Sequence, residues 1–326
     1  MGVFGRAVVA FLFPGQGSQF VGMGRDLTAA SAAARAVFAE ADDVLGTSLS
    51  TLCFDGPESD LTRTSNAQPA ILAHSVAALR ALGEHAGEPQ LAAGHSLGEF
   101  TAYVAAGALP FADALRVVRR RGELMEAAGR ARPGTMAALI GLDEPAVDTV
   151  CRRASEAGGE CVPANYNAPG QIVISGDVAA IDRAIAFARE EGARRAIRLN
   201  VSGAFHSPLM RDAQPGLAAA LDAVTFGEPE FPVVSNVTAE PIRDAAAARR
   251  LLVDQLTVPV RWSACIETMV RAGTRQFLEI GPGSVLAGLL KRIARDREVR
   301  TIGTAVEVEN AKSSHESRVT SHEFGG

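Results

Sequence analysis

The sequence predicts an α/β fold made of a large domain and a smaller lobe inserted into it. The chain has 326 residues, which is long for one small domain, and 47% of them are hydrophobic, enough for a sizeable core. Short apolar runs that favour buried strands alternate with longer stretches that favour helices. Between about residues 131 and 203 the order becomes strand-helix-strand-strand-helix-strand, which is typical of a ferredoxin-like lobe.

The large domain is expected to begin with a buried strand. The run "AVVAFLF" (7–13) is apolar and ends in the glycine-containing turn "PGQGSQ". A second short strand, "QLAAGHS" (90–96), also enters a glycine turn. The helices expected in this part of the chain cover residues 34–41, 68–85, 99–109 and 111–128.

The inserted lobe has its own sequence of elements, and the large domain resumes after it. Expected strands lie at 135–142, 161–167, 171–176 and 193–201, and expected helices at 144–157 and 178–192. Two later apolar runs, "FPVVSNVT" (231–238) and "QFLEIGPG" (276–283), predict further strands of the large domain. The predicted organisation is therefore a discontinuous large domain (1–130 and 204–306), a lobe (131–203), and a polar, disordered tail (307–326).

Composition excludes several classes of protein. The net charge is −5 and no segment is strongly basic, so nucleic acid is not expected to be a partner. The apolar run 8–13 is too short to span a membrane, and no membrane association is expected. The only lysines are Lys291 and Lys312, and no P-loop motif is present, which argues against P-loop nucleotidases and Schiff-base enzymes.

The cysteines indicate a reducing environment. They form no CxxC pair and no metal-ligand spacing, so no metal site is expected, and they are interpreted as buried thiols of a cytoplasmic protein. The four are Cys53, Cys151, Cys161 and Cys265.

The stretch "GHSLGEF" (94–100) contains the strongest catalytic signal. Its G-x-S-x-G pattern, between a predicted strand and a predicted helix, is typical of a nucleophile elbow, a tight turn that presents a serine at the start of a helix. Small residues are needed on both sides of the turn, and Gly94 and Gly98 supply them. Ser96 is therefore the candidate nucleophile, with a structural glycine turn as the alternative.

A nucleophilic serine needs a base, and His206 is the best placed of the six histidines. It follows the last strand of the inserted lobe, at the junction where the chain re-enters the large domain, and binding sites gather at such junctions. His95 adjoins Ser96, but consecutive side chains of an extended segment point apart, so His95 is expected to give packing or hydrogen-bonding support.

Two backbone amides are candidates for an oxyanion hole. One is the N–H of Leu97, directly after the serine, and the other is the amide of Gln16 in the "PGQG" turn. A dinucleotide-binding fingerprint is the competing interpretation of that turn, but Phe20 occupies the place of its third glycine.

A set of further motifs occurs in register along nearly the whole chain, from about residue 8 to 304. They are "FPGQGSQFVGMG", "QPAI", "AGHSLGEFTA", "RRGELM", "NYNAPGQIVISG", "VSGAFHSPLM", "SNVT", "QLTVPVRW" and "EIGPGSVLAGLLKRI". In this order they resemble the malonyl-CoA:acyl carrier protein transacylases and the related acyltransferase domains of polyketide synthases. The resemblance implies an α/β-hydrolase-like large domain with a parallel sheet and an inserted ferredoxin-like lobe, in agreement with the pattern of elements.

The resemblance implies a role for each candidate catalytic residue. Ser96 becomes the nucleophile and His206 the base, while the amides of Gln16 and Leu97 form the oxyanion hole. Gln255 matches a glutamine whose backbone carbonyl orients the histidine.

The resemblance also implies a set of substrate-binding residues. Arg121 becomes a clamp for a free carboxylate, and Asn167 and Gln68 match pocket positions. Phe205, in "GAFH", is typical of members that take malonyl groups and crowds an α-methyl branch, although Gly203 departs from the histidine common in the polyketide domains.

The helix pattern independently predicts that Arg121 points inward. It lies three and four residues after Val118 and Val117, on the apolar face of its helix, whereas Arg119 and Arg120 are expected to be more exposed. A buried arginine requires an anionic partner, and its planar fork suits a carboxylate.

The implied activity is transfer of a malonyl group from malonyl-CoA to the phosphopantetheine thiol of an acyl carrier protein through a malonyl-serine ester. No metal and no redox cofactor is implied, and a monomer that meets the carrier transiently is expected. Carrier proteins are usually acidic, so the basic stretch 291–300 is a candidate docking surface, with an ordinary solvated helix end as the alternative. Three other functions stay open: a hydrolase acting on acyl carrier proteins, a trans-acting polyketide acyltransferase, and a non-catalytic carrier-binding module.

Overall fold

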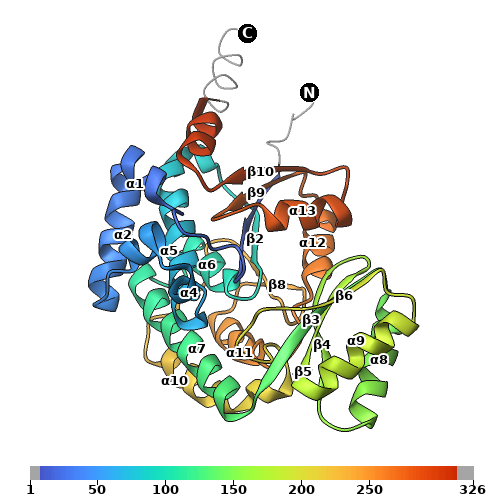
Figure 1. The fold of residues 1–326 in the computed structure, drawn as a ribbon. Helices are drawn as coiled ribbons and strands as arrows, with labels where there is room; N and C mark the ends of the chain where they lie inside the picture. The colour runs from blue at the N-terminus through green and yellow to red at the C-terminus, as the bar shows by residue number, and fades with distance from the viewer. Residues whose placement is uncertain (1–7, 314–326) are drawn as a thin grey trace.

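The larger lobe is built on a six-stranded, mostly parallel sheet. The computed structural model describes residues 8–313, and its strands run in the order β10-β9-β1-β2-β7-β8 (Figure 1). All neighbouring pairs are parallel except β7 and β8. The bounds are β1 Val9–Phe13, β2 Leu91–Gly94, β7 Val233–Val234, β8 Pro241–Ile242, β9 Gln276–Ile280 and β10 Glu298–Ile302.

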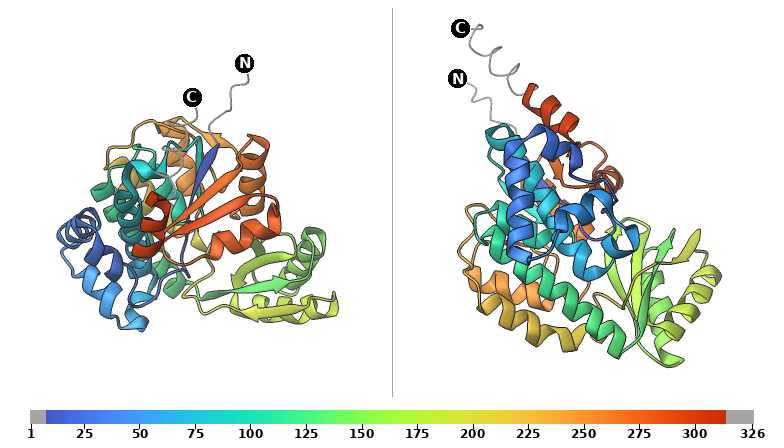
Figure 2. Two further views of the ribbon diagram at one scale, coloured as in Figure 1. Left: turned by 90° about the horizontal axis from the view of Figure 1, so that it is seen from above. Right: turned by 60° about the vertical axis from the view of Figure 1, so that its left-hand side comes forward.

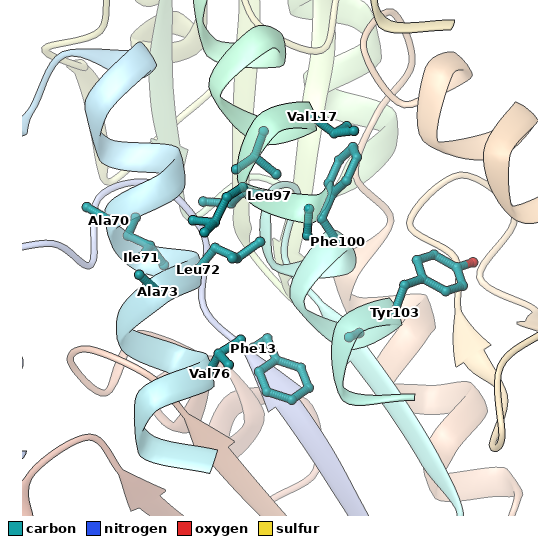
Figure 3. Packing of buried hydrophobic residues seen from close by; sticks show 14 of the residues in the cluster. Phe13, Ala70, Ile71, Leu72, Ala73, Val76, Leu97, Phe100, Tyr103 and Val117 are labelled. Atoms are coloured by element: carbon teal, nitrogen blue, oxygen red, sulfur yellow. The ribbon is translucent and has the colours of Figure 1, made fainter. Parts of the chain in front are cut away.

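Alternation along β1 explains why helices cover both faces of this sheet. Phe11 and Phe13 point to one face and belong to the cluster that includes buried residues of α2, α5, α6 and α7. Ala10 and Leu12 point to the other face and pack with α12 and α13. Figure 3 shows the first cluster, with Phe13 of β1 beside side chains of α5 and α6. Because both faces are buried, the strand is apolar at every position, as a parallel sheet requires.

The helices of the larger lobe surround the sheet (Figure 1). The prediction of long helices was confirmed for the segments before and after the serine motif. The bounds are α1 Arg25–Ala30, α2 Ala32–Leu45, α3 Leu49–Asp55, α4 Glu58–Leu61, α5 Thr64–Leu82, α6 Gly98–Ala105, α7 Phe111–Ala131, α10 Gln214–Asp222, α11 Ala245–Asp254, α12 Trp262–Arg271 and α13 Val285–Ile293.

The smaller lobe has the predicted ferredoxin-like order. Its antiparallel sheet runs β4-β5-β3-β6, and α8 and α9 cover one face, as the green-yellow part of Figure 2 shows. Along β3, Ala137 and Leu139 pack against those helices, whereas Met136 packs with the core of the larger lobe. The bounds are β3 Gly134–Ile140, α8 Glu144–Glu156, β4 Cys161–Ala168, β5 Gln171–Asp177, α9 Val178–Glu190 and β6 Arg195–Arg198.

Hydrogen bonds across the junction fix the two lobes relative to each other. The backbone of Val260 exchanges hydrogen bonds with β4, to Tyr166 N (2.9 Å) and Ala164 O (2.8 Å). Near the β4–β5 turn, the Arg292 guanidinium of α13 donates to Gln171 Oε1 (2.6 Å) and to the Pro169 carbonyl (3.0 Å). These contacts attach the small sheet to the segment before α12 and to the end of α13.

The prediction of a disordered tail from residue 307 was wrong for its first seven residues. Residues 305–313 are helical, and residues 314–326 lie outside the described part of the chain. Glu307 Oε2 accepts hydrogen bonds from Gly303 N (2.9 Å) and Thr304 N (3.0 Å), and Val308 is buried in the core. The local hydrogen bonds of Glu307 and the burial of Val308 stabilise a segment whose polar composition shows no helical period.

The last strand was not predicted either. Residues 298–302, "EVRTI", form β10 beside β9, and they overlap the basic stretch 291–300, which was predicted as a candidate docking surface with a solvated helix end as the alternative. An edge strand with alternating charged residues looks like a solvated surface in sequence. The basic stretch is therefore divided between the end of α13 and β10.

Candidate active site

Ser96 lies on a sharp turn between β2 and α6, as the elbow motif predicts. Its backbone is in the left-handed region, with φ 52°, which is rare for a residue that is not glycine. A Cβ atom at Gly94 would lie 1.7 Å from Gly98 C, and one at Gly98 would lie 2.1 Å from Phe13 O. Both positions must therefore be glycine, because the turn packs directly on itself and on β1.

Two polar side chains from distant segments hold this strained turn in place. Asn236, in the loop after β7, accepts a hydrogen bond from Ser96 N (2.7 Å) and donates to the Gly94 carbonyl (2.8 Å). Gln255, at the end of α11, donates from Nε2 to the Ser96 carbonyl (3.1 Å). Backbone strain of this kind persists only where the surroundings hold it, and it clusters at functional sites.

His206 is hydrogen-bonded to the serine. Its Nε2 lies 2.8 Å from Ser96 Oγ, and its Nδ1 lies 2.8 Å from the backbone carbonyl of Gln255. Because a carbonyl can only accept, Nδ1 carries the proton and Nε2 is left to accept the serine hydroxyl hydrogen. Burial, and secondly the charge of Arg121, lower the pKa of His206 to about 3, so the imidazole is neutral at ordinary pH.

Arg121 is buried beside the same serine oxygen, as its helix pattern predicts. Its side chain is 1% exposed, and Nη2 donates to Ser96 Oγ (3.1 Å). Burial lowers the pKa of Arg121 to about 10, which leaves the guanidinium charged at neutral pH. Arg119 is only half-buried, with a hydrogen bond to Asn66, and Arg120 is exposed and paired with Glu123.

Two glutamines fix the direction of the guanidinium. Nη1 of Arg121 donates to Gln68 Oε1 (2.8 Å), and Nη2 donates to Gln255 Oε1 (2.9 Å). Among the described residues, the Nε–H of Arg121 has no hydrogen-bond partner. The guanidinium is therefore held in one orientation, and one of its buried donors has no acceptor among the described residues.

The remaining predicted site residues line one cavity with the serine. It has a volume of about 400 Å³ and lies between the two lobes. Met125, Met136, Val173 and Leu289 give it an apolar wall. The predicted site residues among its lining are Gln16, Ser96, Leu97, Arg121, Asn167, Phe205 and His206.

His95 does not contact the serine oxygen, in agreement with the supporting role expected for it. Its Nε2 lies 2.8 Å from Asn167 Oδ1 of β4, and its ring lies 5.5 Å from that of Trp262. Asn167, predicted as a pocket residue, thus also links the serine turn to the smaller lobe.

Two residues of the site were not predicted. Asn236 lies in the motif "SNVT", but its contact with the serine turn joins residues 140 positions apart. Glu99 follows the serine and is fully buried, with 0% exposure. The only sequence signal was a carboxylate inside an apolar helix, where an unpartnered charge would be unfavourable.

Residues 8–313 contain neither a candidate metal-binding cluster nor a candidate membrane-spanning helix. No group of three or more His, Cys, Asp or Glu side chains in that range is arranged to hold a metal ion. Within the same residues, no helix is both long and apolar enough to cross a bilayer.

Comparison with known proteins identifies the family. The profile of the family described as "Acyl transferase domain" matches residues 10–317. The chain belongs to this family of acyltransferases. The malonyl CoA-acyl carrier protein transacylase of Bacillus subtilis (strain 168) is 47% identical over 297 residues, which cover 91% of this chain and 93% of that protein. The protein of the same name from Escherichia coli (strain K12) is 45% identical over 285 residues, 87% and 92% of the two chains.

Solved structures agree with this assignment. The acyl-carrier-protein S-malonyltransferase of Bartonella henselae superimposes with a TM-score of 0.90 at 44% identity, covering 95% of this acyltransferase and 99% of that chain. A malonyl-transacylase in complex with its type II PKS acyl carrier protein gives a TM-score of 0.91 at 43% identity, covering 94% and 100%. The two-lobed α/β fold predicted from the sequence is thereby confirmed.

Proposed function

We propose that this acyltransferase moves a malonyl group from malonyl-CoA to the phosphopantetheine thiol of an acyl carrier protein. One observation carries the proposal: Ser96 Oγ lies 2.8 Å from the neutral base His206 and 3.1 Å from the buried cation Arg121. A nucleophile shared between a base and a cation suits an acyl donor that has a carboxylate close to its reacting carbonyl. The names of the relatives support malonyl-CoA as that donor.

In the first half-reaction, His206 Nε2 takes the hydroxyl proton while Ser96 Oγ attacks the thioester carbonyl. Gln16 and Leu97 line the cavity. Their backbone amides are the proposed donors that stabilise the oxyanion. The CoA sulfur leaves with the proton from His206, and a malonyl ester remains on Ser96. The carbonyl of Gln255 stabilises the imidazolium that exists between these steps, because it accepts the Nδ1–H.

Arg121 selects the malonyl group by binding its free carboxylate. Nε and Nη2 share one edge of the planar guanidinium, and two parallel hydrogen bonds from that edge fit a carboxylate. The Nε–H has no partner among the described residues, and Nη2 now reaches the serine oxygen that becomes the ester oxygen. Acylation therefore brings the carboxylate beside the edge of the guanidinium that carries Nε and Nη2.

In the second half-reaction, the thiol of the carrier protein attacks the ester, and His206 again transfers the proton. The complex of a similar transacylase with its acyl carrier protein supports this partner. Lys291 and Arg292 at the end of α13 offer positive charge on the helix that contributes Leu286 and Leu289 to the cavity wall. We place the docking of an acidic carrier there.

No cofactor takes part in this scheme, since the bond changes need only a nucleophile, a base and donors for the oxyanion. The product supplies extender units for fatty acid or polyketide synthesis. The four cysteines are free and buried, which supports the assignment to a reducing compartment.

The test is the intact mass of the protein after incubation with malonyl-CoA and then with a carrier protein. A malonyl adduct that forms on Ser96 and moves to the carrier supports transfer. An adduct lost to water supports a carrier-protein hydrolase, and no adduct at all supports a non-catalytic binding module. Ser96→Ala should abolish the adduct without unfolding the protein, and an acylated alanine variant would show that the nucleophile is another residue.

A further inference from the structure

Glu99 is a buried carboxylate that the proposed mechanism does not use. It lies in the first turn of α6, three residues after Ser96, and has 0% exposure. A buried charge is costly unless other groups compensate it. Its surroundings therefore indicate what it does.

The contacts of Glu99 lead directly to the catalytic groups. Its Oε2 accepts hydrogen bonds from Gln255 Nε2 (2.7 Å) and from Asn236 N (3.1 Å). The other end of the same Gln255 amide, Oε1, accepts from Arg121 Nη2 (2.9 Å). The side chain of Gln255 thus lies between a carboxylate and a guanidinium, and it joins them by two hydrogen bonds in series.

This arrangement permits only one orientation of the Gln255 amide. A carboxylate only accepts hydrogen bonds and a guanidinium only donates them, whereas the two ends of an amide have almost the same shape. In the observed orientation each end of the amide meets a complementary group. After a 180° flip, the amide oxygen would face the Glu99 carboxylate and the amide N–H₂ would face Arg121, so both hydrogen bonds would be lost.

Glu99 is also the acidic group that the Gln255 amide links to Arg121. Among residues 8–313, no carboxylate is hydrogen-bonded directly to Arg121, whose acceptors are two glutamines and the serine. Burial raises the pKa of Glu99 to about 7, against the effect of its hydrogen bonds with Asn236 and Gln255 and of the attraction of Arg121. Burial is the larger effect, and the attraction of the Arg121 charge acts against it, in favour of the ionised carboxylate.

We propose that Glu99 is a positioning residue: it fixes the orientation of the Gln255 amide and, through it, holds the Arg121 guanidinium beside Ser96. The proposal deepens the function proposed above and depends on it for the part that Arg121 plays. His206 is oriented by the backbone carbonyl of Gln255 rather than by its amide. Loss of Glu99 should therefore affect the recognition of the carboxylate more than the transfer of the proton.

The decisive variant is Glu99→Gln, which keeps the size of the side chain and an oxygen that can accept from Asn236 N. Its amide can meet either end of Gln255, so residue 99 no longer selects the orientation of the Gln255 amide, which is then held by the Ser96 carbonyl and Arg121. We expect kcat/KM for loading of Ser96 by malonyl-CoA to fall about 10- to 100-fold, the scale of a hydrogen bond to a charged group. Loading by acetyl-CoA, which has no carboxylate, should stay nearly constant.

A matched control separates positioning from general support of the fold. Glu126 is another buried carboxylate, with 8% exposure, and it accepts a hydrogen bond from Ser65 N (2.8 Å). Glu126→Gln should lower the unfolding midpoint but leave the ratio of malonyl to acetyl loading unchanged. Equal loss of malonyl and acetyl loading in Glu99→Gln would overturn the proposal, because a residue that only supports the elbow affects both substrates alike.

Two further measurements keep the proposal testable if that variant does not fold or if the wild-type protein forms no malonyl ester. Gln255→Leu breaks the same link at its middle residue and should also lower the ratio of malonyl to acetyl loading. An unchanged ratio would refute the relay, which is the series of hydrogen bonds from Glu99 through Gln255 to Arg121. Equilibrium unfolding of Glu99→Leu, Arg121→Met and the double variant needs no activity, and these two residues are joined through the Gln255 amide. Non-additive changes in the free energy of unfolding support the relay, whereas additive changes contradict it. An absent malonyl ester together with coupled unfolding would reject the proposed function and retain the relay.

Discussion

Replacement of Arg121 by alanine tests whether this site is built for a carboxylate. The guanidinium is held by Gln68, Gln255 and the serine oxygen, beside a cavity of about 400 Å³ that Arg121 helps to line. Arg121→Ala removes the only group that is proposed to pair with the malonyl carboxylate. The carboxylate would then enter an apolar cavity without a partner.

The size of the effect follows from the burial of the pair. Breaking a buried ion pair by removing one partner costs about 3–5 kcal/mol. Since 1.36 kcal/mol corresponds to a factor of ten in rate, malonyl loading should fall roughly 10²–10⁴-fold. Acetyl-CoA brings no carboxylate, so its loading should hold or rise when the uncompensated charge is removed. The ratio of malonyl to acetyl loading should therefore fall at least about 10²-fold.

The assay measures the rates of Ser96 acylation by malonyl-CoA and by acetyl-CoA at equal amounts of folded protein. Arg120→Ala is the matched control, because Arg120 is exposed on the same helix and paired with Glu123. Its ratio should equal that of the wild type. Arg121→Lys should recover little, since one ammonium cannot serve both glutamines and a carboxylate at once.

A ratio unmoved by Arg121→Ala would refute this reasoning. It would mean that the carboxylate is bound elsewhere or is not recognised, and that the buried guanidinium has only a structural role. A ratio that fell equally in Arg120→Ala would point to a general effect of α7 rather than to the clamp.

Four further predictions follow from the same geometry. His206→Ala should slow acylation roughly 10²–10⁴-fold, whereas His95→Ala should act mainly on stability; a larger loss for His95→Ala in folded protein would identify it as the base. Phe205→Ser should relax selectivity toward methylmalonyl-CoA by about 1–3 kcal/mol, and an unchanged preference would place the α-carbon elsewhere. Because burial lowers the pKa of His206 to about 3, its imidazole NMR signals should remain those of a neutral ring protonated at Nδ1 from pH 8 down to pH 5; an imidazolium signal near pH 6 would contradict this. Lys291→Glu should raise KM for an acidic carrier without changing malonyl loading, while Arg152→Glu on α8 should change neither, and equal effects of the two would exclude docking at α13.

The local features of the site could be predicted from sequence because their causes are local. The elbow is specified by residues 94–98, where glycine is required by contacts within the turn and with β1. The inward direction of Arg121 follows from its spacing to Val117 and Val118 on one helix. His206 could be singled out from its place at the lobe junction, although it lies 110 residues beyond the serine.

The features that could not be predicted depend on contacts between distant segments. Asn236 and Gln255 reach the serine turn across 140 and 159 positions, and neither hydrogen bond leaves a pattern in the sequence. The implied role of Gln255 came from the family resemblance alone. β10 and the helix at 305–313 were not predicted for a related reason. Most of their residues are polar, so the few apolar side chains that pack into the core give no recognisable periodic pattern.

Gln255 connects two parts of the proposed mechanism, the base and the carboxylate clamp. Its backbone carbonyl accepts from His206 Nδ1, and its side-chain oxygen accepts from Arg121 Nη2. A shift of this residue would therefore move the base and the carboxylate clamp together. Glu99 holds the side chain in the orientation that serves Arg121, while the position of Gln255 at the end of α11 sets its carbonyl. Substitutions at Glu99 should consequently separate selectivity from proton transfer, whereas displacement of the end of α11 should impair both.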